Sequence, residues 1–597
     1  MKVSPLIKVS IVLSALIFII SSGFKTSNAV SDTQKFYRLY LDSLQITNNL
    51  LEQRTSTASA EELQELFKKC RNHYKKIEFI TEYYLPKTAV KINGIPLPES
   101  SAAEPGEAVY PSGFQVVEPL LYQELTLDLR KSIAYEVSSI TNAINHFKAT
   151  APAIELTESQ LLDALKLNIY RMTIKGIAGF DAPVALSGIS EAKSTLECSK
   201  IVFSFFNNSE DLINSCDKAI HFIEKSSTDF NEFDRATFIS KYVNTLCTSL
   251  YNYQEKQGIP FINEPRAISA NAKHLFEEHA FDAIFFAPSG TEATTYEQKL
   301  LGEKLFNNAA LSSNGNRSCA SCHHPEKAFT DGLALNESIF EGRKLLRNTP
   351  TLINAALQSA QFYDTRTAFL EDQVHEVISN KAEMNGSLEA IAAKLNKDSF
   401  YRKLFFAAYH QKTISPSLIR KAVAGYVRSL VALNSPFDKF MRGEESAMNK
   451  EQIDGFNLFM GKARCGTCHF IPLFSGAVPP LYEKMETEVL GVPALSSSAI
   501  PVLDADSGKY HLYKIQHQLH SFKTTGLRNI ALTAPYMHNG VFKTLEEVID
   551  FYDNGGGAGL GFNLSNQTLA PDKLNLTAIE KKRIIAFLNA LTDTSIK

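Results

Sequence analysis

Apolar residues recur every three to four positions through much of residues 30–285, which is the spacing of one buried face on an α-helix. One such stripe consists of Leu63, Leu66, Phe67, Cys70, Tyr74 and Ile77. Helix start signals accompany the stripes: Thr157 and Gln160 have the spacing of a capping box, and apolar positions follow directly. Strand-like alternation is rare here. The pattern predicts an all-α helical domain over residues 30–285.

Two stretches lack this periodicity and are rich in turn-forming residues. Residues 95–113 contain many Pro, Gly and Ser residues and predict a long loop. Residues 287–295, Ala-Pro-Ser-Gly-Thr-Glu-Ala-Thr-Thr, predict a linker. The chain beyond this linker is therefore expected to fold separately from the helical domain.

The first 29 residues have the pattern of a targeting segment. Lys2 and Lys8 form a positively charged segment before an apolar run from Val9 to Ile20. Ser27-Asn28-Ala29 then has the small-x-small pattern of a cleavage site. The run is short for a bilayer-spanning helix, which needs about 20 residues. We expect residues 1–29 to be a signal peptide, and the mature protein to be exported without stable membrane insertion.

The composition indicates a large folded protein. The 597 residues are 44% hydrophobic and 21% charged, which argues against extended disorder. Lys+Arg (61) and Asp+Glu (64) nearly balance, so no basic surface for nucleic acid is expected. Tryptophan is absent, so any aromatic electron-transfer position must use another residue.

Four of the eight cysteines form two copies of the pattern C-x-x-C-H. The copies are Cys319-Ala-Ser-Cys322-His323 and Cys465-Gly-Thr-Cys468-His469. Two thiols at this spacing can bond to the two vinyl groups of one haem, and the following imidazole can bind the iron. Zinc binding or disulfides are the alternatives. Two copies in an exported chain favour two covalently bound c-type haems, attached in the periplasm.

The other four cysteines, Cys70, Cys198, Cys216 and Cys247, all precede residue 250. Export makes one or two disulfides among them an option, although the spacing indicates no pairing. Cys70 lies on an apolar helical stripe, so a buried free thiol is an equal alternative.

Short motifs follow one another from about Gln298 to Asp593. They are Leu301–Phe306 before the first haem motif, then 328–332, Arg347-Asn348-Thr349-Pro350-Thr351, Phe362-Tyr363-Asp364-Thr365-Arg366, 370–373 and 382–384, and after the second haem motif 527–529 and 533–540. In this order they resemble the bacterial dihaem cytochrome c peroxidase family, which includes MauG. The resemblance implies a mainly α fold with a first, peroxidatic haem domain at 295–435 and a second, electron-transfer haem domain at 436–597.

The resemblance also implies catalytic residues. In this family a Gln and a Glu ten residues apart line the peroxide pocket, and Gln373 and Glu383 match them. Glu383 is expected to act as acid and base, with Gln373 as its polar partner. Peroxidases of this family carry a His before the R-N-x-P-T motif that caps the resting iron, and no His lies between His324 and Arg347. The first haem is therefore expected to be open at rest, as in MauG-like members.

Two aromatic positions depart from the peroxidase pattern. Tyr363 stands where family members place a Trp between the haems, either as an electron relay or as a packed aromatic. Tyr552, fourteen residues after His538, matches the second axial ligand of the second haem, where Met is the alternative found in peroxidases. A core tyrosine is the other interpretation of Tyr552, and Met537 and Met485 are the other candidate ligands.

A bridging Ca²⁺ site is implied by the same resemblance. Asn348, with the carbonyls of Thr533 and Pro535, matches the family's ligands, and oxygen ligands suit this ion. The expected partners are H₂O₂ and a small electron-donor protein, a cytochrome c or a cupredoxin, and a homodimer stays open. Two other functions also stay open: a MauG-like oxidase that modifies a protein substrate, and a non-catalytic electron carrier or sensor.

One segment of the helical domain resembles another family. Gly113-Phe114-Gln115-Val116-Val117-Glu118 is similar to the G-x-H-x-x-E motif of imelysin-like helical domains. Gln115 replaces the His of that motif, so no metal-binding or peptidase role is expected here. An ordinary helix start in a helical accessory domain is the simpler interpretation.

Overall fold

The computed structural model describes residues 29–100, 108–227, 229–496 and 500–596, which form two compact units. Unit 1 contains the described residues up to 97, together with 110–226 and 245–262, and unit 2 contains the rest. The regular structure of the described residues is nearly all helical, which confirms the mainly α prediction. The predicted signal peptide lies outside the described residues, except for Ala29, which begins the first described helix. The domain boundaries given above stay predictions.

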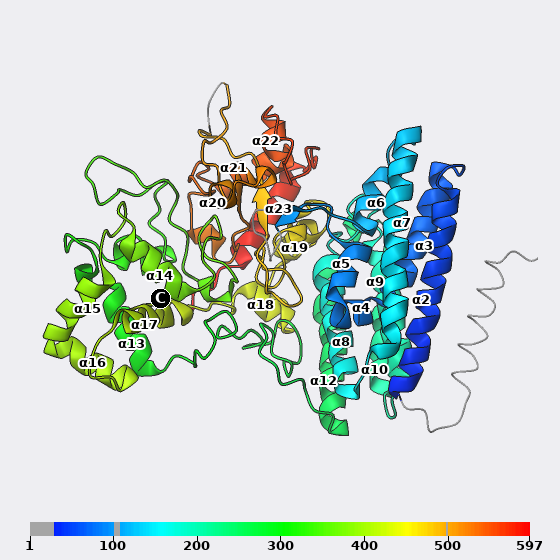
Figure 1. Cartoon of the computed structure of the whole chain (residues 1–597), viewed down its shortest axis with the longest axis horizontal. Helices are drawn as coiled ribbons and strands as arrows, with labels where there is room; N and C mark the ends of the chain where they lie inside the picture. The colour runs from blue at the N-terminus through cyan, green and yellow to red at the C-terminus, as the bar shows by residue number, and fades with distance from the viewer. Residues whose placement is uncertain (1–28, 101–107, 228, 497–499, 597) are drawn as a thin grey trace, which may run out of the picture. The chain divides into compact units, whose positions relative to one another are not determined.

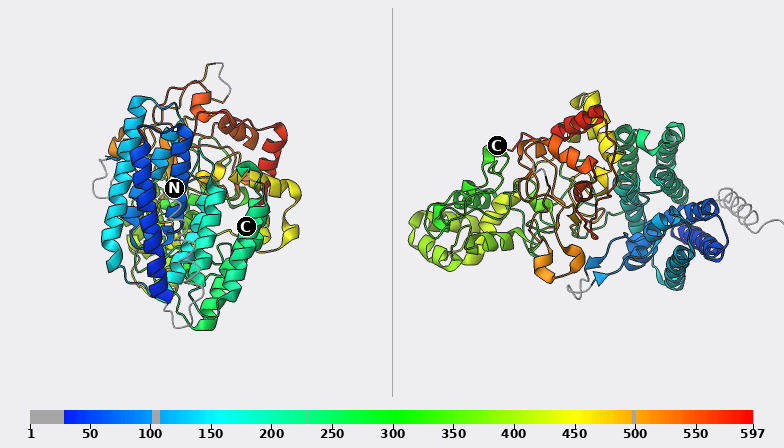
Figure 2. Two further views of the ribbon diagram at one scale, coloured as in Figure 1. Left: turned by 90° about the vertical axis from the view of Figure 1, so that its right-hand side faces the viewer. Right: turned by 90° about the horizontal axis from the view of Figure 1, so that it is seen from above.

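Unit 1 is built from long helices that run side by side (Figure 1; Figure 2, left). They are α2 (Ala29–Arg54), α3 (Ala60–Lys75), α4 (Glu78–Tyr84), α5 (Pro86–Asn93), α6 (Phe114–Leu121), α7 (Leu127–Thr150), α8 (Glu158–Arg171), α9 (Gly188–Phe203), α10 (Glu210–Lys225) and most of α12 (Asn244–Gln257). Side-chain caps fix several starts: Ser59, Thr126 and Thr157 each accept a backbone N–H of the first turn. The predicted start at Thr157 is confirmed.

The apolar stripe through Cys70 packs inside unit 1. Its six residues are all buried, because α3 presents one face to α2, α6 and α9. Cys70, Cys198, Cys216 and Cys247 are likewise buried, and all four are free thiols. Of the two alternatives for Cys70, the structure has the buried thiol.

The stretch 95–113 contains more structure than the predicted loop. β1 (Glu99–Ser100) pairs antiparallel with β2 (Ala108–Val109). Strands of two residues are too short to produce an alternating pattern, so turn-forming residues dominate the sequence there. The predicted linker 287–295 is irregular, and Thr295 then caps the next helix with a complete capping box.

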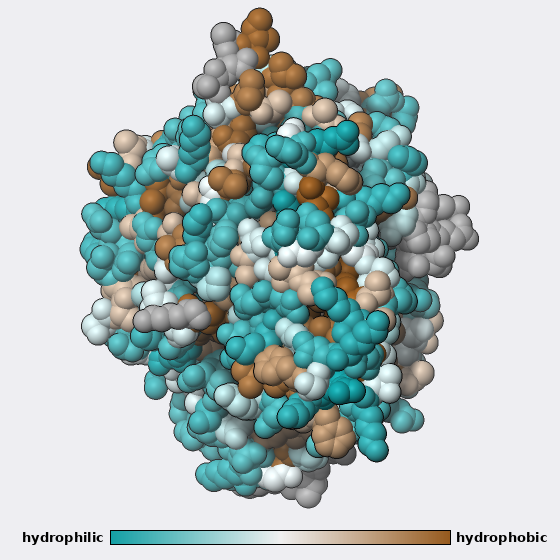
Figure 3. Space-filling view, turned by 90° about the vertical axis from the view of Figure 1, so that its left-hand side faces the viewer, coloured by the Kyte–Doolittle hydropathy of each residue, from teal (hydrophilic) through white to brown (hydrophobic). Residues whose placement is uncertain are grey.

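The first part of unit 2 is a cluster of five helices (Figure 1). They are α13 (Tyr296–Phe306), α14 (Leu370–Ser379), α15 (Leu388–Lys397), α16 (Ser399–Tyr409) and α17 (Pro416–Arg428). α13 lies against α17 at Gly302, where an added Cβ would be 2.1 Å from the Ala422 carbonyl oxygen. Figure 3 shows that the surface over this cluster is mainly hydrophilic, with scattered apolar side chains.

The remainder of unit 2 consists of short helices and long loops. The elements are α11 (Arg235–Thr237), α18 (Pro436–Met441), α19 (Lys450–Met460), α20 (Tyr510–Tyr513), α21 (Leu545–Asp553), α22 (Gly556–Gly559), α23 (Ala578–Ala590), and the antiparallel pair β3 (Thr487–Val489) and β4 (Ser521–Lys523). α19 and α23 touch at Gly455, which an added Cβ would bring within 1.9 Å of the Arg583 carbonyl oxygen. Edge-to-face and tilted phenylalanines fill this core, among them Phe437, Phe456 and Phe587.

In the part of the chain that the structure describes, no helix is both long enough and apolar enough to cross a bilayer.

Candidate active site

The first C-x-x-C-H motif forms one tight turn. Cys319–Ser321 is a 3₁₀ turn, and the His323 backbone N–H donates to the Cys319 carbonyl at 3.0 Å. The His323 Nδ1 atom lies 2.9 Å from the Phe329 carbonyl oxygen. Because this contact requires a proton on Nδ1, the Nε2 atom keeps its lone pair. Burial lowers the pKa of His323, which favours the neutral imidazole that a metal ion binds.

The second motif repeats this geometry. Cys465–Thr467 is a 3₁₀ turn, and the His469 backbone N–H donates to the Cys465 carbonyl at 2.9 Å. The His469 Nδ1 atom lies 3.1 Å from the Thr525 carbonyl oxygen, which again leaves Nε2 available. Burial lowers the pKa of His469 to about 4. Gly466 permits close packing on α19, since an added Cβ would be 2.5 Å from the Met460 Sδ atom.

These two turns fit the donor set of covalent haem. All four motif cysteines are free thiols rather than disulfides, and each pair is followed by an imidazole whose Nε2 can bind iron. Within the described residues, no group of three His, Cys, Asp or Glu side chains could hold a metal ion, so the zinc alternative gains no support.

Glu383 lies close to the first motif. It follows α14 in a turn, where its Oε1 atom accepts a hydrogen bond from Asn380 Nδ2 at 2.7 Å. Its carboxylate is close enough to Cys319 and Cys322 to raise the pKa of both thiols, so the carboxyl group lies near this turn. Burial raises the pKa of Glu383, against the opposing effects of Arg366 and Arg317.

Gln373 and Tyr363 line one cavity of unit 2. Gln373 projects from α14, whereas Tyr363 lies in an irregular segment and donates its hydroxyl to Asn348 Oδ1 at 3.4 Å. Burial raises the pKa of Tyr363 well above its usual value, so the phenol keeps its proton at neutral pH. The cavity lining does not include Glu383, so the structure does not bring the predicted catalytic pair together in this space.

The three predicted calcium ligands meet in the same cavity. Asn348, Thr533 and Pro535 all line it, although they are far apart in the sequence. The Asn348 backbone N–H donates to the His538 carbonyl at 2.7 Å, and its Nδ2 atom donates to the Leu333 carbonyl at 2.8 Å. The Asn348 Oδ1 atom and the backbone carbonyls of the other two residues are oxygen donors of the kind Ca²⁺ prefers.

Tyr552 lies near the cysteines of the second motif. It is in the last turn of α21, where Cys468 and Cys465 are close enough to contribute to the shift of its pKa. Burial raises the pKa of Tyr552 far above its usual value. Met537, one of the alternative ligands, instead lines the cavity that Gln373 and Tyr363 share.

The loop Phe329–Leu346 contains no histidine or methionine. Its one amine, Lys344, forms an ion pair with Glu337. Asn336 donates to Asp331 Oδ2 at 2.7 Å and lies 3.5 Å from Cys322 Sγ. The arrangement therefore agrees with the sequence, which has no histidine here.

Several residues of this region were not predicted. Arg347 bonds to Asp364 and Asp506 at 2.6 Å each, and Lys523 lines the cavity beside Tyr363. Arg347 belongs to a recognised motif, and its conspicuous charge next to Asn348 was the available signal. Lys523 had none, because a single lysine in a short strand has no spacing pattern.

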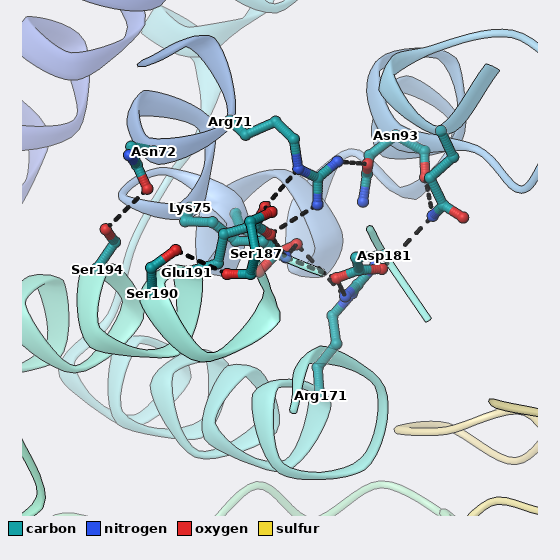
Figure 4. A network of polar contacts seen from close by, with 12 residues as sticks. Arg71, Asn72, Lys75, Asn93, Arg171, Asp181, Ser187, Ser190, Glu191 and Ser194 are labelled. Atoms are coloured by element: carbon teal, nitrogen blue, oxygen red, sulfur yellow. Dashed lines mark hydrogen bonds and ion pairs between the residues drawn. The ribbon is translucent and has the colours of Figure 1, made fainter. Parts of the chain in front are cut away.

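Unit 1 contains a buried charge network around Arg71, Lys75 and Arg171 (Figure 4). In the segment similar to imelysin-like domains, Gln115 Nε2 donates to Asp181 Oδ1 of this network at 3.4 Å, and Glu118 is buried. Arg71 bonds bidentately to Glu191 at 2.6 and 2.7 Å, and Lys75 and Arg171 each bond to Asp181 at 2.6 Å. Glu191 belongs to α9, whereas Asp181 lies in the irregular segment before that helix. The ion pairs make this a structural centre, in keeping with the simpler interpretation of this segment.

Comparison with known proteins agrees with the site. The model of the di-haem cytochrome c peroxidase family matches residues 296–446. The chain is 34% identical over 306 residues to cytochrome-c peroxidase IdrP2 of Denitromonas iodatirespirans, which covers 49% of this chain and 80% of that protein. It is 30% identical over 310 residues to the methylamine utilization protein MauG of Methylophilus methylotrophus, which covers 51% of this chain and 84% of that protein. A crystal structure of a MauG-like protein associated with microbial copper homeostasis is 30% identical, with a TM-score of 0.44, and covers 51% of this chain and 91% of that chain.

Two C-x-x-C-H turns, each with a histidine whose Nε2 atom can bind iron, are typical of a protein with two c-type haem sites. The chain belongs to the di-haem cytochrome c peroxidase family, and this family implies two c-type haems.

Proposed function

We propose that the protein is a periplasmic peroxidase that reduces H₂O₂ to water with electrons from a small redox protein. The observation that carries the proposal is the partly buried carboxyl group of Glu383 near the first haem motif, with its pKa raised mainly by desolvation. A carboxylic acid with a raised pKa suits proton transfer. The predicted signal peptide and the need for haem attachment outside the cytoplasm support the location.

The proposed roles follow the two motifs. Cys319, Cys322 and His323 hold the first haem, and Cys465, Cys468 and His469 hold the second. Tyr552 is the proposed second ligand of the second haem. Its place near Cys465 and Cys468 supports this role. Asn348, Thr533 and Pro535 are the proposed Ca²⁺ ligands, supported by their shared cavity wall.

Cys319, Cys322 and His323 would hold the first haem, which would supply the iron that binds peroxide and the electrons for cleavage of its O–O bond. Glu383 accepts the proton of the near oxygen atom and delivers it to the far oxygen atom, so that the O–O bond breaks with water as the leaving group. Asn380 holds the carboxyl group in position through its 2.7 Å hydrogen bond to Oε1. Two protons and two electrons per H₂O₂ complete the conversion to two waters.

Electrons reach the first haem domain singly. The donor protein, a cytochrome c or a cupredoxin, supplies them at the second haem domain, and Tyr363 lies in the segment between the two motifs. With its proton retained and Asn348 Oδ1 as its hydrogen-bond partner, Tyr363 serves as a neutral aromatic bridge in this proposal.

A second function is favoured by two features of the sequence. The loop Phe329–Leu346 lacks a histidine, and Tyr552 stands where peroxidases use Met, as in MauG-like members. A relative named MauG is 30% identical. A dihaem oxidase that modifies a protein substrate is therefore the alternative to the peroxidase.

Steady-state turnover of H₂O₂ with a reduced cytochrome c, and in parallel with a reduced cupredoxin, distinguishes these functions. The proposal expects catalytic oxidation of one donor with a stoichiometry of two donor molecules per H₂O₂. A reaction with H₂O₂ but without turnover of either donor would favour the oxidase. No reaction with H₂O₂ at all would leave an electron carrier or sensor.

A further inference from the structure

The cavity lined by Gln373 and Tyr363 in unit 2 has cationic side chains in its wall but no carboxylates. Its described lining residues contain only two groups that are ionised at neutral pH, the guanidinium of Arg528 and the ammonium of Lys523. All others are apolar side chains, amides, hydroxyls or the phenols of Tyr363 and Tyr536. Both ionised groups are cations, so the lining itself provides no negative charge.

The charge of Arg528 is neutralised by Asp438, which does not itself line the cavity. Its Nη1 and Nη2 atoms each bond to a carboxylate oxygen of Asp438 at 2.7 Å, and its Nε atom donates to the Pro472 carbonyl at 2.9 Å. Asp438 is buried and its pKa is lowered, with Arg528 opposing the effect of burial. This arginine therefore needs no further counter-charge.

Lys523 has only neutral hydrogen-bond partners. Its Nζ atom donates to Gln358 Oε1 at 2.6 Å and to the Ala360 carbonyl at 3.2 Å. No carboxylate of the described residues forms an ion pair with it. Asp364 acts on it from a greater distance, but this carboxylate is already bound by Arg347 at 2.6 Å and by Arg366 at 3.0 Å.

A cation in such a place requires an anion. Transfer of an ammonium group into a protein interior without a counter-charge costs several kcal/mol, or else the group loses its proton. Burial lowers the pKa of Lys523 to about 8, which reflects this missing partner. An anion in the cavity would raise the pKa again and keep the ammonium charged.

We propose that Lys523 binds a propionate carboxylate of a bound haem. A haem brings its own carboxylates into the site. Lys523 also lies between the segment of Tyr363 and the segment that contacts His469. Its backbone N–H donates to the Tyr363 carbonyl, and two residues later the Thr525 carbonyl binds His469 Nδ1. This inference rests on the haem attachment proposed above, but not on peroxidase activity.

The pairing has an electrostatic consequence. A haem gains an electron more readily when its propionate charge is neutralised, so the Lys523 ammonium raises the midpoint potential of the haem that it contacts. Its removal leaves an uncompensated carboxylate, which favours the ferric state.

The test is a spectroelectrochemical titration of the full-length dihaem protein and three variants of Lys523. Lys523→Met and Lys523→Gln remove the charge and are expected to lower the midpoint potential of one haem, while Lys523→Arg is expected to keep it near the wild-type value. Lys509→Met is the matched control. Lys509 is also partly buried and interacts with Asp364, but does not line the cavity, so no shift is expected.

Each result decides the proposal. Haem loss in Lys523→Met and Lys523→Gln, but not in Lys523→Arg, would also support it. Unchanged potentials in Lys523→Met, or an equal shift in Lys509→Met, would overturn it. Titrations with and without added sodium acetate identify the source of the carboxylate. A wild-type potential that depends on acetate, with the dependence absent in Lys523→Met, would show a free-anion site instead of a propionate contact.

Discussion

Glu383 and Glu118 are glutamates with raised pKa values, the first partly buried and the second fully buried, and their surroundings differ. Glu383 has two arginines near it and a hydrogen bond from Asn380, and it lies beside the first pair of motif thiols. Glu118 accepts the backbone N–H of Ala185 at 2.7 Å on one oxygen, while its other oxygen has no partner. Proton transfer is the role proposed for Glu383, whereas Glu118 is expected to affect only the free energy of unfolding.

Glu383→Gln should slow peroxide cleavage by roughly 10²–10⁴-fold, because the amide keeps the size of the side chain but cannot accept the proton. Haem content should stay the same. Stopped-flow rates with H₂O₂ measure the effect, and Glu376→Gln, an exposed residue on α14, serves as the control. Near-normal rates in Glu383→Gln would remove this residue from the mechanism.

Glu118→Gln should reduce the pH dependence of stability. Burial raises the pKa of Glu118 from 4.5 to about 7 in the folded protein, so the folded state binds the proton more tightly than the unfolded state. Stability from this group is present below pH 4.5 and is lost as the pH rises to about 7, by up to roughly 3 kcal/mol.

Calorimetric melting at pH 5 and pH 8 checks this prediction. The wild type should lose more stability between the two values than Glu118→Gln does. The exposed Glu124→Gln should behave like the wild type. The same pH dependence in all three proteins would show that Glu118 is ionised at little cost.

At the level of elements, α3 and α9 are joined by a buried ion pair. Arg71 and Glu191 are both buried, and each nitrogen–oxygen contact of the pair is shorter than 2.8 Å. Ser187 also donates to Glu191. The Ser194 hydroxyl also donates to Asn72 Oδ1 at 3.2 Å, so polar contacts fix the register between the two helices.

Glu191→Gln should destabilise unit 1 by about 3–5 kcal/mol, since it leaves the Arg71 guanidinium buried without a counter-charge. Glu197→Gln, on the same helix but in a partly exposed pair with Lys76, should cost less than about 1 kcal/mol. Chemical denaturation followed by circular dichroism compares the two variants. A similar loss of unfolding free energy in both variants would mean that the buried ion pair stabilises the fold no more than the exposed one.

Helices were predictable where a stripe and a cap coincide, as at Thr157 and along α3. The β1–β2 hairpin was not, because two-residue strands carry no periodicity. In the candidate site, the haem motifs were evident since their chemistry requires fixed local spacing. Lys523 and Asp438 were not, because their charges become meaningful only when distant segments meet at one cavity.

At the scale of the whole molecule, the two C-x-x-C-H turns imply a fixed cofactor content. The mature protein should carry two covalent haems, and Cys319→Ala or Cys465→Ala should each impair attachment of one. Intact mass spectrometry and the pyridine haemochrome spectrum give the number. Fewer than two haems in fully matured wild-type protein would contradict the assignment of the motifs.

The central claim concerns the first haem domain: the resting protein reacts with peroxide without prior reduction. The loop Phe329–Leu346 has no imidazole or thioether, and its Lys344 is paired with Glu337. Carboxylates and an amide compete poorly with water for an open ferric iron, and Tyr552, as the proposed ligand, would stabilise the ferric state of the second haem.

Stopped-flow mixing of the fully oxidised protein with one equivalent of H₂O₂ tests this claim most directly, with an electron paramagnetic resonance spectrum of the resting protein. The account predicts one high-spin haem at rest and an immediate change of the haem spectrum on mixing. A protein that is low-spin at both haems and inert until it is half-reduced would contradict it.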